Sequence, residues 1–173
     1  TAAVDGLTAT RAAGKDTWTQ DDNIAISVDG GASSKTYKIT NASSGAMEPA
    51  VTGDPCYWQK NTDQQILAWH PAEGATGVDI SDQSSGFANI DYLTADVTAD
   101  FTTEAVALPF KHQMAKVKYM LVKGDGISND DITNATVSIS GYQHVSFSKG
   151  KVSSTDNNNV WIQSETTDRE ALV

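Results

Sequence analysis

Apolar and polar residues alternate along most of the chain with a period of two, which is typical of half-buried β-strands. Ile24, Ile26 and Val28 share one face of a predicted strand. The residues Asp29-Gly30-Gly31 tolerate positive φ and can turn the chain into a partner strand over residues 35–40. Helical periodicity is nearly absent. The pattern therefore predicts an all-β protein.

The middle of the chain continues this pattern. Residues 56–59 and 66–70 are rich in aromatic and β-prone side chains, and the polar residues 60–63 between them predict a connecting turn. Two more strands are predicted over residues 106–112 and 115–121, each with apolar side chains on one face. The second is expected to lie in the centre of its sheet.

The last third of the chain is expected to add short antiparallel strands, at residues 132–140, 145–147, around 152 and 160–162. Turns are predicted at Lys149-Gly150 and at residues 156–159. Residues 71–101 are predicted to form a long excursion with short strands or turns of its own. Short antiparallel strands without intervening helices favour a β-sandwich.

The pattern indicates one main domain over residues 15–165. Residues 1–14 contain only Val4 and Leu7 as sizeable apolar side chains, so they predict either an edge strand or a flexible lead-in. Residues 166–173 resemble the beginning of another element, which indicates that the chain is cut from a longer one.

Charge and composition exclude several classes of protein. The 173 residues carry a formal net charge of −10 without any cluster of Lys and Arg, which excludes nucleic-acid binding. No apolar run approaches the roughly 20 residues of a membrane-spanning helix. A charged and then apolar signal segment is also absent, so a secreted protein is expected here in mature or trimmed form.

The sequence offers no catalytic or metal-binding pattern. His70, His112 and His144 lack metal-ligand spacing, and His112 is expected to be a core or sheet-edge residue. Cys56 is the only cysteine, which excludes an intramolecular disulfide and a cysteine-based zinc site. Residues 124–131 are acidic but miss the register of a calcium loop, so we interpret them as a solvated turn. We expect a protein that is not an enzyme and holds neither metal nor cofactor.

Four tryptophans leave a second function open. If exposed, Trp58 and Trp161 could stack on sugar rings, which would make the protein a carbohydrate-binding β-sandwich of the cell surface. Large aromatic side chains on alternating strands more often belong to the core.

Several segments, taken in order, resemble the fimbrillin family of Bacteroidales surface proteins. Thr10-Arg11-Ala12, followed by Trp18 and then Asp22 to Ile26, is similar to the opening "TRA … W … GD-I-I" of that family. Ile66 to Pro71 resembles its "F-A-Y-Y-P" strand. The most specific block is Asp91 to Ala95 followed by Val106 to Val117, which resembles "DLL-A … V-L-F-H-M-A-K-V".

The resemblance implies a structural pilus subunit built of two domains, each a transthyretin-like β-sandwich with Greek-key topology. Family members are exported as lipoprotein precursors and displayed on the outer membrane in fimbriae, where they support adhesion to a host or bacterial surface. Residues 166–173 would then begin the connection to a C-terminal domain that this chain lacks. The resemblance also implies assembly by strand exchange with other fimbrial subunits.

In that scheme an arginine-specific protease removes the first strand, and a neighbouring subunit donates a strand to the exposed groove. The chain contains two arginines, Arg11 and Arg169. Arg11 lies between the Val4/Leu7 segment and the first clear strand, so we expect it to be the processing site. An ordinary exposed arginine in a lead-in segment is the alternative.

Overall fold

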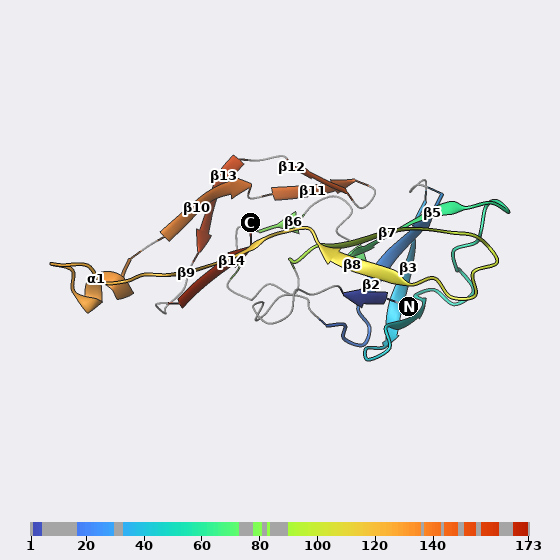
Figure 1. Cartoon of the computed structure of the whole chain (residues 1–173), viewed down its shortest axis with the longest axis horizontal. Coiled ribbons are helices and arrows are strands. Elements are labelled where there is room, and N and C mark those ends of the chain that lie inside the picture. Colours follow the sequence, from blue (N-terminus) through green and yellow to red (C-terminus); the bar gives the residue numbers. More distant parts are fainter. Residues whose placement is uncertain are drawn as a thin grey trace.

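The computed structural model describes residues 2–4, 17–29, 33–72, 78–80, 83, 90–135, 137–142, 144–148, 151–154, 157–162 and 168–172. Nearly every element in these ranges is a strand, which confirms the all-β prediction. Figure 1 shows an elongated arrangement, with the largest sheet at one end and the short helix α1 (Asn129–Thr133) at the other.

The largest sheet has the strand order β1-β8-β7-β5-β2-β3-β4. Its strands are β1 (Ala2–Val4), β2 (Asn23–Val28), β3 (Lys35–Asn41), β4 (Ala46–Pro49), β5 (Gln64–His70), β7 (Leu93–Ala99) and β8 (Leu108–His112). The six strands from β8 to β4 are antiparallel to their neighbours, whereas β1 is parallel to β8. The antiparallel sheet confirms the predicted fold class.

The predicted hairpin between β2 and β3 is confirmed by their antiparallel pairing. Asp29 has a φ of 65°, in the left-handed region expected of this turn, and Gly30 and Gly31 lie outside the described residues. β5 ends at His70, before Pro71. It pairs with β2 on one side and with β7 on the other, so it is the central strand.

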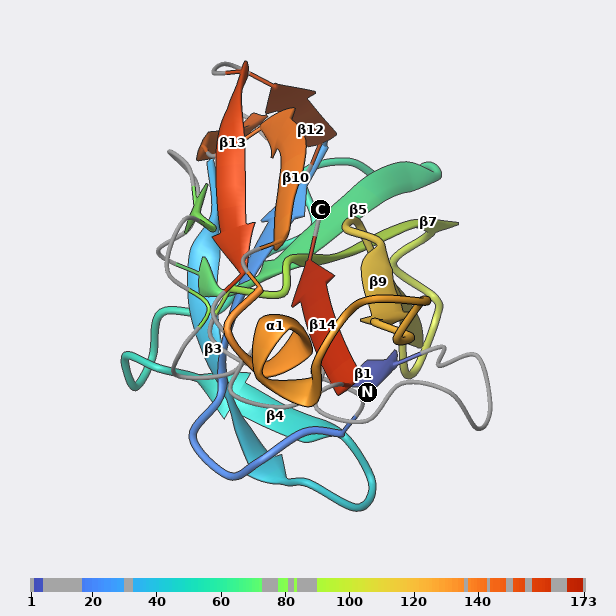
Figure 2. The ribbon, with the colours of Figure 1, turned by 90° about the vertical axis from the view of Figure 1, so that its left-hand side faces the viewer.

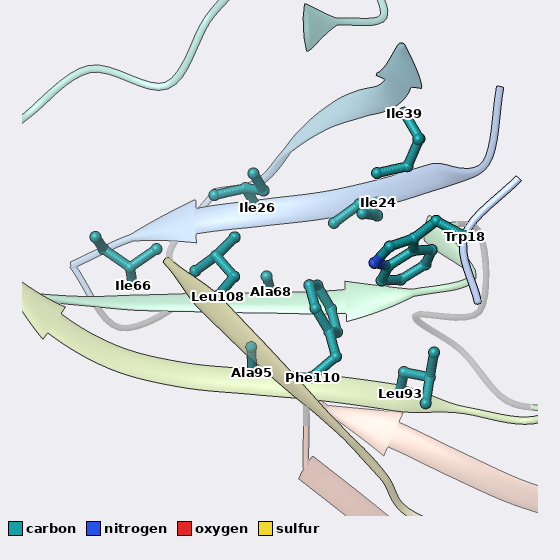
Figure 3. Close-up of a cluster of buried hydrophobic side chains, with 10 residues drawn as sticks. All are labelled: Trp18, Ile24, Ile26, Ile39, Ile66, Ala68, Leu93, Ala95, Leu108 and Phe110. Atoms are coloured by element: carbon teal, nitrogen blue, oxygen red, sulfur yellow. The ribbon is translucent and has the colours of Figure 1, made fainter. Parts of the chain in front are cut away.

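One face of the sheet carries what we call the main core cluster. Its buried side chains come from five strands and from the segment before β2: Trp18, Ile24, Ile26, Ile39, Ile66, Ala68, Leu93, Ala95, Leu108 and Phe110. Figure 3 shows β8 crossing this face, with Leu108 and Phe110 among the side chains of the strands below. β8 pairs with β7 only at Lys111 and His112. Because its earlier residues, Leu108 to Phe110, diverge from β7, β8 acts as a cover for the sheet.

The opposite face of the sheet carries a second cluster, which consists of Ala25, Leu67, Trp69, Ile80, Tyr92 and Met114. Trp69 and Leu67 belong to β5, so this strand is buried on both of its faces, as its nearly continuous apolar sequence requires. Both faces of the sheet are therefore covered at its centre.

The remaining strands form three smaller ladders. β9 (Lys116–Met120) pairs with β14 (Asp168–Leu172), and β10 (Val137–Tyr142) pairs with β13 (Asn157–Ile162). β11 (His144–Ser148) lies between β12 (Lys151–Ser154) and β6 (Val78–Asp79). Figure 2, which is seen from the α1 end, shows the β10/β13 and β9/β14 ladders in front of the large sheet.

The β11/β12 hairpin is confirmed, with Ser148 opposite Lys151; its turn at residues 149–150 lies outside the described residues. The turn predicted at residues 156–159 is wrong for its last three residues, because Asn157 already begins β13. Asp156 is not among the described residues.

The strand predicted over residues 56–59 is wrong. Backbone N–H groups in this segment bond to side chains instead of to a neighbouring strand. The N–H of Cys56 donates to Tyr37 Oη at 2.8 Å, and the N–H of Gln59 donates to Gln64 Oε1 at 3.0 Å. The segment is therefore held as an irregular strap beside the sheet, which we call the 54–60 strap.

The sequence predicts only short elements within residues 71–101, whereas β7 pairs with β5 along all seven of its residues. Leu93, Ala95 and Val97 alternate along it with polar residues, as a strand requires. Ala95, Asp96 and Ala99 conceal this signal, because Ala and Asp are depleted in strands compared with Val or Ile.

Two further strand predictions need correction. Residues 115–121 do not form the long central strand, because β9 has five residues and is paired with β14 alone among the described strands. Residues 132–140 do not form one strand, because Ile132 belongs to α1 and β10 begins at Val137. A capping box between Ser128 and Asp131 starts this helix.

Phe110 tests the packing of the main core cluster. It is fully buried and makes an edge-on contact with Trp18, with ring centroids 5.1 Å apart. We expect Phe110→Ala to lower the free energy of unfolding by about 3–5 kcal/mol, because it leaves a cavity. Urea denaturation would measure this. The control Phe101→Ala, at a half-exposed position, should change the free energy of unfolding by no more than about 0.5 kcal/mol. Equal losses of stability in the two variants would contradict the burial of Phe110 in the main core cluster.

Candidate functional site

An apolar groove opens on the face of the sheet that carries the main core cluster. Its volume is about 220 Å³, and its lining residues come from β2, β3, β4, β5, the start of β8 and the 54–60 strap: Ile26, Val28, Tyr37, Met47, Cys56, Trp58, Ile66, Val106 and Leu108. No single stretch of sequence contains the groove, so it could not be predicted from local patterns.

The groove exists because the residues that the structure describes cover the main core cluster only in part. Ile26, Ile66 and Leu108 are buried at its floor. The other six lining side chains are only partly buried, although all of them pack against the cluster. These partly buried side chains leave hydrophobic area in contact with water. A further segment could cover that area.

The 54–60 strap forms one wall of the groove, and polar side chains hold it in place. Gln64, at the start of β5, is buried; its Oε1 accepts from the N–H of Gln59, and its Nε2 donates to the carbonyl of Lys60 at 2.9 Å. Lys60 Nζ in turn donates to Asp29 Oδ1 at 2.9 Å. These bonds fix the distance between the strap and the sheet, so the groove does not depend on strand pairing at this wall.

Two polar side chains in the wall of the groove form hydrogen bonds within the wall. Tyr37 Oη accepts the N–H of Cys56, and the Cys56 thiol donates to the carbonyl of Ile26 at 3.3 Å. Burial raises the pKa of the Cys56 thiol and that of the Tyr37 hydroxyl, so both groups are neutral at pH 7. The groove therefore offers a neutral, mostly carbon and sulfur surface.

The edge of β8 lies beside the groove. β1 covers this edge with three residues, and its register places Ala2 opposite Leu108 and Val4 opposite Phe110. Because the pairing is parallel, β1 runs from Leu108 toward the far end of β8, away from Val106. The groove, which Val106 and Leu108 line, thus lies beside the first residue of β1, at the end of β8 where Leu108 begins it.

The predicted site residues have different places in the structure. Arg11, the predicted processing site, lies outside the described residues. Trp58 is partly buried against the main core cluster and lines the groove. Trp161 lies in β13 opposite Ser138, and its side chain is not described. The structure thus brings only Trp58 of these residues to the groove.

The histidines are held by local partners. His70 Nδ1 lies 2.7 Å from the carbonyl oxygen of Asn23, and its ring meets that of Trp18 edge-on. His112 Nδ1 lies 2.7 Å from Asp91 Oδ2, with side chains 5% and 1% exposed. His144 lies in β11 opposite Asp79. Within the described part of the chain, no three His, Cys, Asp or Glu side chains gather in a way that could hold a metal ion.

The sequence offers no sign of the Asp91–His112 pair, because 21 residues separate the partners. The pair joins the segment before β7 to the last residue of β8, close to where Leu93 pairs with His112. It therefore fixes the point at which β8 leaves the sheet and crosses the main core cluster.

Removal of His112 tests this role. His112→Phe keeps most of the side-chain volume but deprives the buried Asp91 carboxylate of its ring partner. We expect the free energy of unfolding to fall by about 3–5 kcal/mol in chemical denaturation, because one partner of a buried pair is lost. Lys35→Met, which breaks the exposed Lys35–Asp54 pair, should leave it nearly unchanged. A similarly small effect of His112→Phe would show that the buried pair does not stabilise the fold.

The reactivity of Cys56 tests the burial of its thiol in the wall of the groove. Because its raised pKa lowers the thiolate fraction at a given pH, iodoacetamide should alkylate it more slowly in the folded chain than in the urea-unfolded chain at pH 8. Intact-mass spectrometry over time would measure both rates. Equal rates would mean that the thiol is neither buried nor held by Ile26.

Two solved structures have a similar fold. A candidate cell adhesion protein from Bacteroides uniformis ATCC 8492 matches with a TM-score of 0.65 at 22% identity, over 91% of this chain and 69% of that chain. Another, from Bacteroides ovatus ATCC 8483, matches with a TM-score of 0.64 at 20% identity, over 99% of this chain and 74% of that chain. At these identities the likeness shows the fold alone. No curated protein matches the sequence.

None of the helices in the described ranges has the length and hydrophobicity to cross a membrane. The family model described as fimbrillin-like matches residues 10–173, and therefore covers almost the whole chain. This match agrees with the resemblance noted in the sequence, from Thr10 to the block around Val106–Val117. The protein thus belongs to the fimbrillin-like family, and it is a structural protein of the cell surface and not an enzyme.

Proposed function

We propose that this protein is a subunit of surface fimbriae that assembles by accepting an extended strand from a neighbouring subunit. The observation that carries the proposal is the open groove on the main core cluster, which lies in line with the β8 edge. A strand added there would satisfy backbone groups of β8 and cover the partly buried apolar side chains at the same time.

Arg11 is the proposed processing site, and an arginine-specific protease is the proposed partner that acts on it. Cleavage after Arg11 would separate β1 from the rest of the chain, because β1 ends at Val4. The pairing that would be lost is short and parallel, and parallel pairs are slightly less stable per residue than antiparallel ones. Loss of β1 would leave the β8 edge free for a donor.

The family further supports export as a lipoprotein precursor and display on the outer membrane, where fimbriae mediate adhesion to a host or bacterial ligand. The two candidate cell adhesion proteins that share the fold are consistent with this proposal. The carbohydrate-binding alternative gains little from the groove, because a sugar needs several polar partners beside the aromatic ring and most of the side chains that line the groove are apolar.

Limited digestion with an arginine-specific protease tests the proposal. We expect cleavage after Arg11 in the folded chain, followed by higher oligomers or by capture of a donor-strand peptide, as measured by intact mass and size-exclusion chromatography. Arg11→Lys should resist this cleavage and stay monomeric. Arg169→Lys, at the second arginine, should behave like the unaltered chain. A chain that is cut after Arg11 and binds no strand would contradict strand exchange.

A further inference from the structure

We infer that a second pocket beside the 54–60 strap, which we call the polar pocket, binds one neutral hexose unit of a surface glycan, with the ring of Tyr57 as its stacking platform. This inference rests on the proposed role in adhesion, to which it adds a class of ligand, and it does not depend on strand exchange. The polar pocket has a volume of about 250 Å³. Its lining residues that do not also line the groove are Asp29, Ser33, Lys35, Pro55, Tyr57 and Gln59.

The 54–60 strap separates the polar pocket from the groove. Successive side chains of an extended segment point to opposite sides. Trp58 lines the groove, whereas its neighbours Tyr57 and Gln59 line the polar pocket. Cys56 lines both, so the two pockets adjoin along the strap. The strap thus presents an apolar ring to the groove and a phenol ring to the polar pocket.

The ring of Tyr57 is exposed, although it is one of the larger aromatic side chains of the protein. Its exposed fraction is 66%, and it belongs to neither core cluster, whereas Trp58 packs against the main core cluster. Tyr has an apolar ring and a polar hydroxyl group. The C–H groups on one face of a pyranose can pack on such a ring while the hydroxyl groups at the rim of the sugar stay hydrated or find polar partners.

The side chains near Tyr57 supply those polar partners. Gln59 Nε2 donates to the carbonyl of Tyr57 at 2.9 Å, which holds the amide beside the ring and directs its Oε1 away from this bond. Both carboxylate oxygens of Asp29 lie 2.9 Å from Lys60 Nζ, so this carboxylate is fixed in place and keeps lone pairs for two neighbouring sugar hydroxyl groups. Ser33 adds a hydroxyl group that can donate and accept.

The charges at the polar pocket favour a neutral sugar. Lys35 Nζ donates to Asp54 Oδ1 at 2.6 Å, and Lys60 Nζ donates to Asp29 Oδ1. Each lysine is therefore matched by one aspartate, and the four charges cancel. An ionised sugar would lose hydration on entering the pocket without meeting a net opposite charge.

The size and position of the polar pocket restrict the ligand further. An apolar cavity of about 150 Å³ accommodates benzene, so a pocket of about 250 Å³ has room for one sugar ring with its hydroxyl groups. Its strand residues come from β2 and β3, which lie inside the large sheet between other strands. These strands offer no sheet edge to a peptide backbone.

Saturation-transfer difference NMR on the untreated full chain measures sugar binding. The probes are the methyl pyranosides of glucose, mannose and galactose, with glucuronic acid as an ionised sugar and sorbitol as a polyol without a ring. We expect at least one neutral pyranoside to bind with a Kd of about 1 mM. Glucuronic acid and sorbitol should bind at least about tenfold more weakly. The bound sugar should shift the backbone amide signals of Ser33, Tyr57 and Gln59.

Substitutions in the strap locate the sugar. Tyr57→Ala should weaken binding about tenfold, whereas Tyr57→Phe keeps the ring and should retain most of it. Asp29→Asn should also weaken binding about tenfold, because it removes a charged acceptor, and Asn tolerates the φ of 65° at this position. Trp58→Phe, on the groove side, and Phe101→Ala, at an exposed ring elsewhere, should leave the Kd unchanged. The thermal unfolding midpoint of each variant checks that it folds.

The outcomes separate the sugar site from the assembly of the subunit. If no neutral pyranoside binds at up to about tenfold the expected Kd, the sugar site is wrong, while digestion at Arg11 still decides strand exchange. If a sugar binds but Tyr57→Ala has no effect, or Trp58→Phe weakens binding instead, the sugar lies elsewhere and the inference is overturned. Equal binding of sorbitol, or a preference for glucuronic acid, would overturn it as well. Sugar binding that depends on Tyr57 in a chain that captures no donor strand would leave the sugar site standing and contradict strand exchange alone.

Discussion

The fold depends on how the apolar face of the large sheet is covered. Ile24, Ile66 and Leu93 come from different strands and would all face water if the sheet stood alone. β8 provides the cover by crossing the sheet, where it places Leu108 and Phe110 over the cluster, before it pairs with β7 at Lys111 and His112. The Asp91–His112 pair holds the end of that crossing. A single strand cannot cover the whole face, and the groove is the part that remains.

Much of the sheet was predictable from alternation alone. The strands β2, β3 and β8 combine β-branched or aromatic residues with a clear period of two, and β5 is marked by a short apolar run that contains Ile66 and Trp69. Local preference agrees with the final fold in these strands. The pattern does not predict β7 as a long strand, because Ala95 and Ala99 stand where larger apolar side chains would give a clearer alternation. The sequence of the 54–60 strap predicts a strand because Tyr57 and Trp58 are β-prone. Its backbone N–H groups donate to the side chains of Tyr37 and Gln64 instead of to a neighbouring strand.

The groove could not be predicted from the sequence for a different reason. Its lining joins Ile26 of β2, Met47 of β4 and Val106 before β8, which lie far apart in the chain and meet only after the sheet has formed. The sequence shows the alternation of Val106, Leu108 and Phe110. It does not show that Val106 lies at the margin of the core. The sequence makes Trp58 a candidate for sugar stacking, whereas its position against the main core cluster follows only from the fold.

The half-buried position of Cys56 has a consequence for the chemistry that this protein meets outside the cell. An unpaired cysteine in an oxidising environment tends to form disulfides between molecules, and the reactive species is the thiolate. Burial raises the pKa of Cys56 and its thiol donates to the carbonyl of Ile26, so the thiolate fraction is lowered. The chain can thus carry a free thiol on the bacterial surface with a lowered tendency to form covalent crosslinks between its copies.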